Sequence, residues 1–236
     1  MRSVSRIAVA VAAVAFAASV PFAVATAQGD ANRAVAGGGI SVPGWMGQVD
    51  ASAAKAGQSV NDAKFTQDGK MIHVITGPAT TYWNPANKAS GNYTVKATFT
   101  EPKFQNLNSH SHPYGIVIGG ADLGGDQATY LYCAVNGNGS FIVRGMGPAP
   151  FQMNGRAGET NAAVHKAAAV GDLVTNEVAV SVAGDKVTCS MNGTVVATYA
   201  KADLVTAGKL KGTDGVYGVR FAHNTEVTMT GLTLSK

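Results

Sequence analysis

The sequence predicts an all-β domain built as a sandwich of two antiparallel sheets. Short runs of β-branched and aromatic residues alternate with turn residues at intervals of about 8–12 residues, a pattern typical of a sandwich or barrel. Glycine accounts for 29 of the 236 residues, and so much glycine suits a fold with many tight turns better than a helical bundle. We find no internal repeat of fixed period, which argues against a solenoid or a propeller.

The first two thirds of the chain carry eight expected strands joined by short turns. The Asp68-Gly69 pair suits a hairpin turn between the second and third of them. Two alanine-rich segments, 51–56 and 162–169, are each expected to carry one helical turn without changing the fold class. The eight expected strands lie at 44–49, 63–66, 70–76, 80–83, 91–100, 114–119, 129–135 and 140–144.

The C-terminal third shows the clearest strand pattern. Valines at 178, 180 and 182 alternate with polar or small residues, and Gly184-Asp185 provides a turn. Asn192-Gly193 is the strongest short hairpin signal in the chain. Strands are therefore expected at 176–182, 186–191, 194–199, 216–222 and 226–234.

The N-terminus has the features of a secretory signal peptide. Arg2 and Arg6 precede an apolar stretch, and Ala25-Thr26-Ala27 is a cleavage site of small residues. The alternative is a membrane anchor, but Pro21 interrupts the stretch, which is shorter than a comfortable span of about 20 residues. We therefore expect a signal peptide at 1–27, a flexible leader at 28–39 and a single β-sandwich domain at 40–236, in a protein that is secreted or periplasmic.

Charge and composition exclude several classes of function. Only 14% of the residues are charged and 46% are hydrophobic, which excludes a disordered polyelectrolyte. The net charge of +4 would fall to +2 on cleavage, because the signal peptide carries two arginines and no acid. With no cluster of Lys and Arg, the sequence gives no support to nucleic-acid binding. The mature domain is expected not to span a membrane, because its apolar runs are short.

Strand alternation predicts one outer face that carries aromatic and basic side chains. In 130–135 the apolar set Leu131, Cys133 and Val135 faces the core, so Tyr130 and Tyr132 share the opposite face. The same rule places Arg144 and Arg220 outside. Aromatic rings stack on sugars and guanidinium groups bind hydroxyls or carboxylates, so these four residues are candidates for a binding surface. The alternative is an ordinary half-exposed sheet face.

Other candidate chemistry is weaker. His110 and His112 lie two residues apart, so on an extended segment they would point to the same side and offer two ligands to a transition metal. The loop from Asp122 to Asp126 offers oxygen ligands for calcium but lacks the full spacing of a helix-loop-helix calcium site. A solvated loop and a plain turn are the favoured interpretations. We therefore expect no metal and no cofactor, with calcium or a transition metal as the alternative.

The sequence offers few candidates for catalysis. The four glutamates are widely separated, and no Gly-x-Ser-x-Gly motif is present. The only two cysteines, Cys133 and Cys189, both fall on predicted core faces, so they either form a disulfide or remain two buried thiols.

The chain resembles the concanavalin A-like lectin/glucanase superfamily, in particular a secreted bacterial branch related to 3-keto-disaccharide hydrolase domains. The resemblance covers roughly residues 44–236. It rests on segments that read Gly-Asn-Tyr-Thr-Val at 91–95, Tyr-Gly-Ile-Val-Ile-Gly-Gly at 114–120, Tyr-Leu-Tyr at 130–132 with the Asn138-Gly139 turn, Asn-Glu-Val at 176–178, the strand 187–191 with the Asn192-Gly193 turn, and Gly-Val-Tyr-Gly-Val-Arg at 215–220. It implies a concanavalin A-like jelly roll. It does not select an activity, because members of the superfamily bind glycans or cleave them.

Two further features bear on what the resemblance implies. The Glu-x-Asp-x-x-Glu motif of the related glucanases is absent, which argues against that activity. The segment 77–85 looks like a signature of secreted members, and its Tyr82-Trp83 pair is either a glycan platform or a packing plug.

We therefore expect a secreted, non-catalytic, lectin-like protein whose partner is a carbohydrate or glycoconjugate. An enzyme acting on a modified glycoside, such as a keto-sugar hydrolase or lyase, is one alternative. A structural or protein-interaction module of the cell envelope is the other. The expected ligand-binding residues are Tyr130, Tyr132, Arg144, Arg220, Trp83, His110 and His112.

Overall fold

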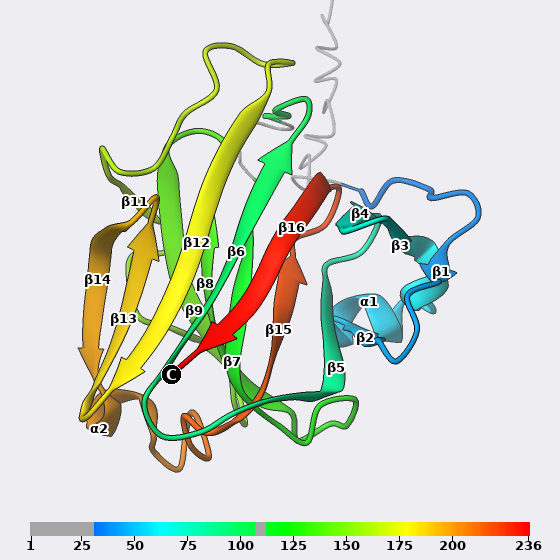
Figure 1. Cartoon of the computed structure of the whole chain (residues 1–236). Coiled ribbons are helices and arrows are strands. Elements are labelled where there is room, and N and C mark those ends of the chain that lie inside the picture. Colours follow the sequence, from blue (N-terminus) through cyan, green and yellow to red (C-terminus); the bar gives the residue numbers. More distant parts are fainter. Residues whose placement is uncertain (1–30, 107–111) are drawn as a thin grey trace, which may run out of the picture. The chain divides into compact units, whose positions relative to one another are not determined.

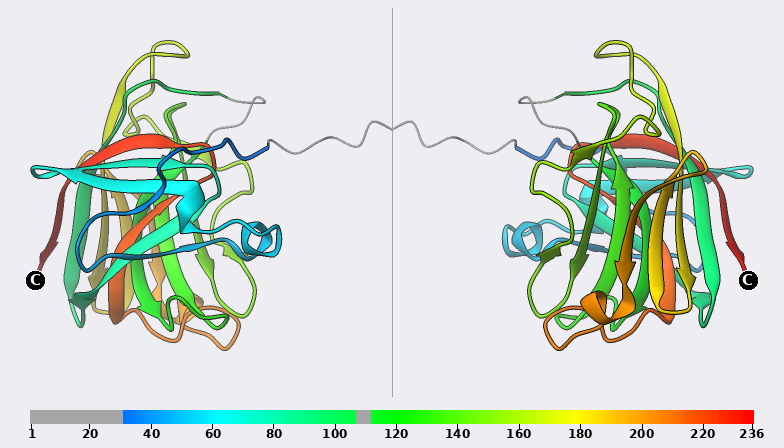
Figure 2. Two further views of the ribbon diagram at one scale, coloured as in Figure 1. Left: turned by 90° about the vertical axis from the view of Figure 1, so that its right-hand side faces the viewer. Right: turned by 90° about the vertical axis from the view of Figure 1, so that its left-hand side faces the viewer.

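A computed structural model describes residues 31–106 and 112–236. Its compact folded unit runs from Asn32 to Lys236. Two eight-stranded sheets pack against each other, and Figure 1 shows the sheet with β12, β6 and β16 in front of the sheet with β8, β7 and β15. The side views in Figure 2 show the two layers on edge. The predicted all-β sandwich of two antiparallel sheets is confirmed.

The sheets are antiparallel except for one short parallel pair, β1 with β3. Sheet A contains, in spatial order, β1 (Gly39–Ile40), β3 (Ala63–Asp68), β4 (Met71–Thr76), β16 (Glu226–Ser235), β6 (Tyr93–Glu101), β12 (Val174–Ala183), β13 (Lys186–Met191) and β14 (Thr194–Ala200). Sheet B contains β10 (Phe151–Gln152), β9 (Ser140–Met146), β8 (Thr129–Val135), β7 (Tyr114–Ala121), β15 (Gly215–Phe221), β5 (Thr80–Ala89) and β2 (Met46–Val49), and β11 (Glu159–Thr160) also pairs with β9.

The two sheets differ in what covers their outer faces. Along β12 the residues alternate between buried and half-buried, as expected for a strand with one face toward the core and one toward solvent. Every residue of β8 is buried. The outer face of sheet B is therefore buried under other parts of the chain. The alternation of residues along the strand does not predict this burial.

Within residues 31–106 and 112–236, short helices occur at three places. The predicted turn at 51–56 is confirmed as α1 (Ala51–Lys55), and two further pieces are the 3-10 helix η1 (Val60–Asp62) and α2 (Lys201–Leu204). The helical turn expected at 162–169 is absent, so that prediction was wrong. The Asn176 side chain bonds both the N–H and the carbonyl of His165, at 2.8 and 3.2 Å, and these tertiary hydrogen bonds replace helical ones.

Residues 32–39, expected to belong to a flexible leader, are held against the domain. The Arg33 backbone N–H donates to Asn224 Oδ1 at 2.7 Å, and its guanidinium donates to the carbonyls of Thr76 and Thr225. The compact unit therefore begins at Asn32 rather than at Ile40. The segment lacks an amphipathic period, which is why a flexible leader was expected. That signal does not report these contacts, because they are hydrogen bonds of Arg33 to residues distant in the sequence.

The core lies between the sheets and has the predicted composition. Leu131, Cys133 and Val135 of β8 are at most 1% exposed and belong to the main hydrophobic cluster. Cys133 and Cys189 form a disulfide with a Cα–Cα distance of 6.2 Å. Since Cys133 lies on β8 and Cys189 on β13, the disulfide links the two sheets through the core.

Reduction of the Cys133–Cys189 disulfide should destabilise the domain. A disulfide typically contributes about 2–4 kcal/mol by restricting the unfolded chain, and 1 kcal/mol shifts the melting temperature by about 2–4 °C in a domain of this size. Calorimetry should therefore show a lower melting temperature in reductant. The double variant C133A/C189A should melt lower than the unaltered protein and be insensitive to reductant. An unchanged melting temperature after complete reduction, verified by thiol titration, would contradict this expectation.

Candidate functional site

The outer face of sheet B carries a second, smaller hydrophobic cluster. Its members come from neighbouring strands, with Val117 of β7 opposite Tyr132 of β8, and Ala134 of β8 opposite Ile142 of β9. The Tyr130 and Tyr132 rings lie 6.2 Å apart between centroids. The cluster consists of Val117, Tyr130, Tyr132, Ala134 and Ile142, with Leu123 and Met146 packed against it.

Tyr130, Tyr132 and Arg220 share this face, as strand alternation predicts. They are not exposed, however: their exposed fractions are 5%, 8% and 7%. The expectation of an open aromatic surface was therefore wrong. The reason is tertiary, because these side chains pack against one another and bond to residues from other strands and loops.

Arg220 is the centre of a buried polar network. Its guanidinium donates to the Thr81 hydroxyl at 2.9 Å, to the Tyr130 hydroxyl at 3.1 Å and to Asp50 Oδ2 at 2.7 Å. The guanidinium also lies 5.0 Å from the centroid of the Tyr132 ring, within range of a cation–π interaction. The Thr81 and Tyr130 hydroxyls are themselves 3.0 Å apart.

The electrostatics of this network keep Arg220 charged. Burial by itself lowers the pKa of the guanidinium, but Tyr130 and Asp50 outweigh burial and raise that pKa well above its usual value. Burial raises the pKa of the Tyr130 hydroxyl, against the lowering effect of Arg220, so the hydroxyl stays protonated at neutral pH. The network therefore holds one cation and one carboxylate as a fixed pair.

A cleft of about 440 Å³ opens over this network, and we call it the Asp50 cleft. The end of β2 and the start of α1 form one wall, and the β7–β8 and β9–β10 loops form the others. The cleft is lined by Gln48, Val49, Asp50, Ala51, Lys55, Thr81, Gly125, Asp126, Ala128, Tyr130, Met146, Gly147, Pro148 and Pro150.

The side chain of Gln48 fixes the β7–β8 loop beside the cleft. Its Oε1 accepts from the Gly124 N–H at 3.2 Å, and its Nε2 donates to the Gly125 carbonyl at 3.5 Å. Asp122, in the same loop, forms an ion pair with Lys211. This loop was the candidate calcium loop, and in the structure Asp122 is instead paired with a lysine.

Trp83 and Arg144 do not line the Asp50 cleft. Trp83 is 3% exposed and Tyr82 is 0% exposed, so the pair packs as a plug rather than forming an open platform. A Cβ placed on Gly124 would lie 3.6 Å from the Trp83 ring, so the β7–β8 loop lies against this tryptophan. Arg144 is half-buried and donates to the Arg156 carbonyl at 2.5 Å.

His112 is not part of the cleft lining either. His110 lies outside the described residues. His112 is 6% exposed, its Nδ1 lies 2.7 Å from the His223 carbonyl, and the two imidazoles form an edge contact at 4.7 Å. The expectation that His112 sits in a solvated loop was wrong, because its ring is packed against His223. Within residues 31–106 and 112–236, no group of three His, Cys, Asp or Glu side chains is placed to hold a metal ion.

Glu101 is a buried acid at the end of β6, away from the cleft. Its carboxylate accepts from the Gln105 N–H at 3.1 Å and from the Tyr114 hydroxyl at 3.3 Å. Burial raises the pKa of Glu101 to about 7, and these two hydrogen bonds only partly oppose the shift. Glu101 is therefore the described carboxyl group that holds a proton closest to neutrality.

Sequence reasoning missed Asp50 and Thr81, which lie at the centre of the site. Asp50 stands directly before α1, where an acidic residue is expected as a helix cap, but the structure shows no capping hydrogen bond from its side chain. Thr81 follows the strand alternation that places Trp83 on the same face. That alternation was the available signal for Thr81, whereas nothing local connects Asp50 to Arg220.

We expect the loss of Asp50 to destabilise the domain more than the loss of Arg220. In D50A the buried guanidinium loses its counter-charge, which should cost about 3 kcal/mol. In R220M the Thr81 and Tyr130 hydroxyls still bond to each other and Asp50 can turn to water, so the cost should be smaller. Denaturant unfolding measures both. The control D126A, which removes another carboxylate of the cleft, should change stability by less than about 0.5 kcal/mol. Equal losses in D50A and D126A would contradict a special role for the pair.

Glu101 should make the domain less stable as the pH rises from about 4.5 to about 7. Across this interval the unfolded chain gives up the Glu101 proton while the folded domain retains it. The free energy of unfolding of E101Q, relative to that of the unaltered protein, should therefore rise from pH 5 to pH 8. The difference in melting temperature between the two proteins should rise with it, by roughly 2–4 °C for each kcal/mol. Both proteins contain the same histidines, so the contribution of histidine titration to the melting temperature drops out of the difference. A difference in melting temperature that does not vary with pH would refute this account.

Comparisons of the sequence with known proteins find no match. No protein-family model matches the chain, and no curated protein matches it either. Among the described residues, no helix is long and apolar enough to cross a membrane.

Several solved structures are similar to the chain at low sequence identity. A Bacillus subtilis protein of unknown function with a galectin-like fold has a TM-score of 0.50 at 11% identity, over 80% of this chain and 88% of that one. The carbohydrate-binding module CBM66 from Bacillus subtilis has a TM-score of 0.45 at 8% identity, over 82% of this chain and 96% of that one. Sheep galectin-11 has a TM-score of 0.42 at 11% identity, over 63% and 93%. The first of these, with its TM-score of 0.50, supports a galectin-like β-sandwich fold for this chain.

Proposed function

We propose that the protein is an exported, non-catalytic carbohydrate-binding protein and that the Asp50 cleft holds the glycan. The observation that carries this proposal is the cleft itself, with a preorganised polar floor of Thr81, Tyr130 and Asp50 held by Arg220. Its volume of about 440 Å³ lies in the range of small-molecule sites. Because Arg220 fixes the floor, a ligand need not order these groups on binding.

The chemistry of the cleft favours a neutral, polyhydroxylated ligand. The charges of Asp50 and Arg220 compensate each other, and Asp126 and Lys55 add one charge of each sign. The wall formed by Met146, Pro148 and Pro150 offers an apolar surface beside those hydrogen-bonding groups. Sugars present hydroxyls at their edges and apolar C–H groups on their faces, which matches this combination.

The predicted binding residues take different roles in this proposal. Tyr130 lines the cleft and offers its hydroxyl oxygen. Arg220 and Tyr132 do not line the cleft and would not touch the ligand. Arg220 instead orients Asp50 and stacks on the Tyr132 ring. Trp83 lies beneath the β7–β8 loop, where a Cβ placed on Gly124 would lie 3.6 Å from its ring. Arg144 and His112 contribute no side chain to the cleft lining.

Export to an oxidising compartment is part of the proposal. It is supported by the signal-peptide features of residues 1–27 and by the disulfide between Cys133 and Cys189, because structural disulfides form mainly outside the cytosol. Pulse labelling and N-terminal sequencing of the exported protein should find Gln28 as the first residue. A mature chain that still begins at Met1 would contradict cleavage.

An enzyme acting on a modified glycoside is the second candidate, and one observation favours it. Asp50 and Asp126 line the same cleft, and glycoside hydrolysis uses a pair of carboxyl groups. One of that pair must act as a proton donor. Asp50 is already bonded to the Arg220 guanidinium at 2.7 Å, so one member of the pair is engaged as the counter-charge of a buried cation. We therefore favour binding over hydrolysis.

Blocking the cleft should abolish glycan binding. In A51W a bulky ring enters the cleft from an exposed position on α1, whereas Ala54 lies on the same helix, is also exposed and does not line the cleft. On a glycan array, the unaltered protein and the control A54W should bind the same glycans, and A51W should lose at least about tenfold in affinity, or about 1.4 kcal/mol.

Three outcomes would contradict the proposal. Absence of binding to any glycan would refute it, and co-purification with an envelope protein would then favour the structural alternative. Equal binding by A51W and A54W would place the site elsewhere. Release of reducing sugar from a bound glycan, lost in D126N, would show that the protein is an enzyme.

A further inference from the structure

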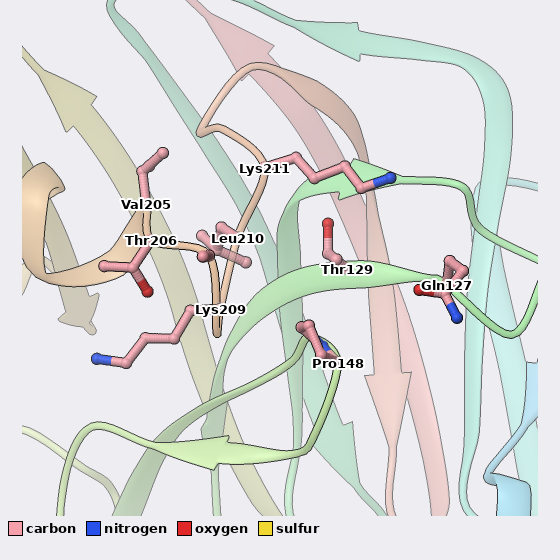
Figure 3. Close-up of a pocket in the computed structure, with 9 residues that line it drawn as sticks. Gln127, Thr129, Pro148, Val205, Thr206, Lys209, Leu210 and Lys211 are labelled. Carbon is pink, nitrogen blue, oxygen red and sulfur yellow. The ribbon is translucent and has the colours of Figure 1, made fainter.

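A second cavity lies beside the Asp50 cleft, and we call it the Thr129 cavity. Its volume is about 470 Å³, and it is formed by the start of β8, Pro148 and the loop that follows α2. Figure 3 shows Thr129 between Gln127 and Leu210, with its hydroxyl pointing toward the Lys211 side chain. The cavity is lined by Gln127, Thr129, Pro148, Val205, Thr206, Ala207, Lys209, Leu210 and Lys211.

The Thr129 cavity and the Asp50 cleft share their dividing wall. Along the chain from 126 to 130 the lining residues alternate: Asp126, Ala128 and Tyr130 line the cleft, while Gln127 and Thr129 line the cavity. Alternation of this kind is expected when an extended segment separates two spaces. Pro148 lines both spaces. The two are therefore neighbours across a wall that is one segment thick.

The Thr129 hydroxyl has no hydrogen-bond partner among the described residues, although Thr129 is only 3% exposed. A buried hydroxyl without a partner is unfavourable, so a ligand hydroxyl that reaches this group would supply a hydrogen bond that the described residues do not. The buried Leu210 and the side chains of Val205 and Pro148 add apolar surface next to it.

The two lysines of the Thr129 cavity are already engaged by the protein. Lys209 Nζ donates to the Asp203 carbonyl at 2.7 Å and lies 5.7 Å from the centroid of the Phe151 ring. Lys211 forms its ion pair with Asp122. An anionic ligand would have to compete with these partners, so the cavity favours an uncharged group, as the Asp50 cleft does.

We propose that the cleft and the cavity form one extended site, and that the ligand is a neutral oligosaccharide rather than a single sugar. This inference rests on the proposed function. One sugar unit occupies the Asp50 cleft, the chain passes Pro148, and a later unit enters the Thr129 cavity, where one of its hydroxyls bonds to Thr129. The two volumes, about 440 and 470 Å³, are similar and leave room for sugar units on both sides of Pro148.

Affinity should therefore depend on chain length. The probes are cello-, laminari-, malto- and inulo-oligosaccharides of two to six units, titrated by calorimetry. For the series that binds, the hexasaccharide should bind roughly tenfold more tightly than the disaccharide, which corresponds to about 1.4 kcal/mol. T129V, which removes only the unpartnered hydroxyl, should weaken hexasaccharide binding by about two- to tenfold and leave disaccharide binding unchanged.

A matched pair of variants tests the second half of the site. Ala207 is exposed and lines the Thr129 cavity, whereas Ala183 is exposed at the end of β12 and lines neither space. A207W should remove the chain-length dependence, and A183W should preserve it. The melting temperature of each variant verifies that it folds.

The outcomes separate this inference from the proposed function. If no series binds, the proposed function fails and the inference fails with it. If di- and hexasaccharides bind equally, or if A207W and T129V leave the chain-length dependence intact, the proposed function stands and the extended site is refuted. The extended site is supported if A207W and T129V lose affinity for the hexasaccharide while A183W does not, and if disaccharide binding is unchanged.

Discussion

The buried Arg220 guanidinium is the interaction on which the outer face of sheet B depends. It lies on the interior strand β15 and joins Asp50, which directly follows β2, to Thr81 of β5, Tyr130 of β8 and the ring of Tyr132. A buried cation is tolerated when it is paired and hydrogen-bonded. The ion pair with Asp50 and the bonds to the Thr81 and Tyr130 hydroxyls meet this need, and they fix the floor of the Asp50 cleft.

The inner face of the same sheet depends on apolar packing and one covalent link. Leu131 and Val135 pack in the core beside Cys133, whose disulfide to Cys189 connects sheet B with sheet A. β8 therefore carries the core on one side and the polar floor on the other. Because its two faces are held by different interactions, variants on the outer face test binding without removing the core.

The loops decide the shape of the candidate site. Gln48 holds the β7–β8 loop through Gly124 and Gly125, and the ion pair of Asp122 with Lys211 joins that loop to the segment after α2. These contacts hold the walls of the Asp50 cleft and the Thr129 cavity, which lie on opposite sides of the segment 126–130. Rigid walls favour a ligand of defined shape, since little entropy is lost in ordering them.

The sequence by itself determined the sandwich, its longer strands and the core face of β8, because alternation and turn chemistry are local and Leu131, Cys133 and Val135 follow from a period of two. It did not predict the two-residue strands β1, β10 and β11 or the extension of β5 to Ala89. It did place Tyr130, Tyr132 and Arg220 on one face. Only the tertiary structure decided that this face is covered, that the two cysteines meet and that Asp50 pairs with Arg220, 170 residues away. Burial and pairing of this kind depend on which distant segments pack together, and no local pattern encodes that choice.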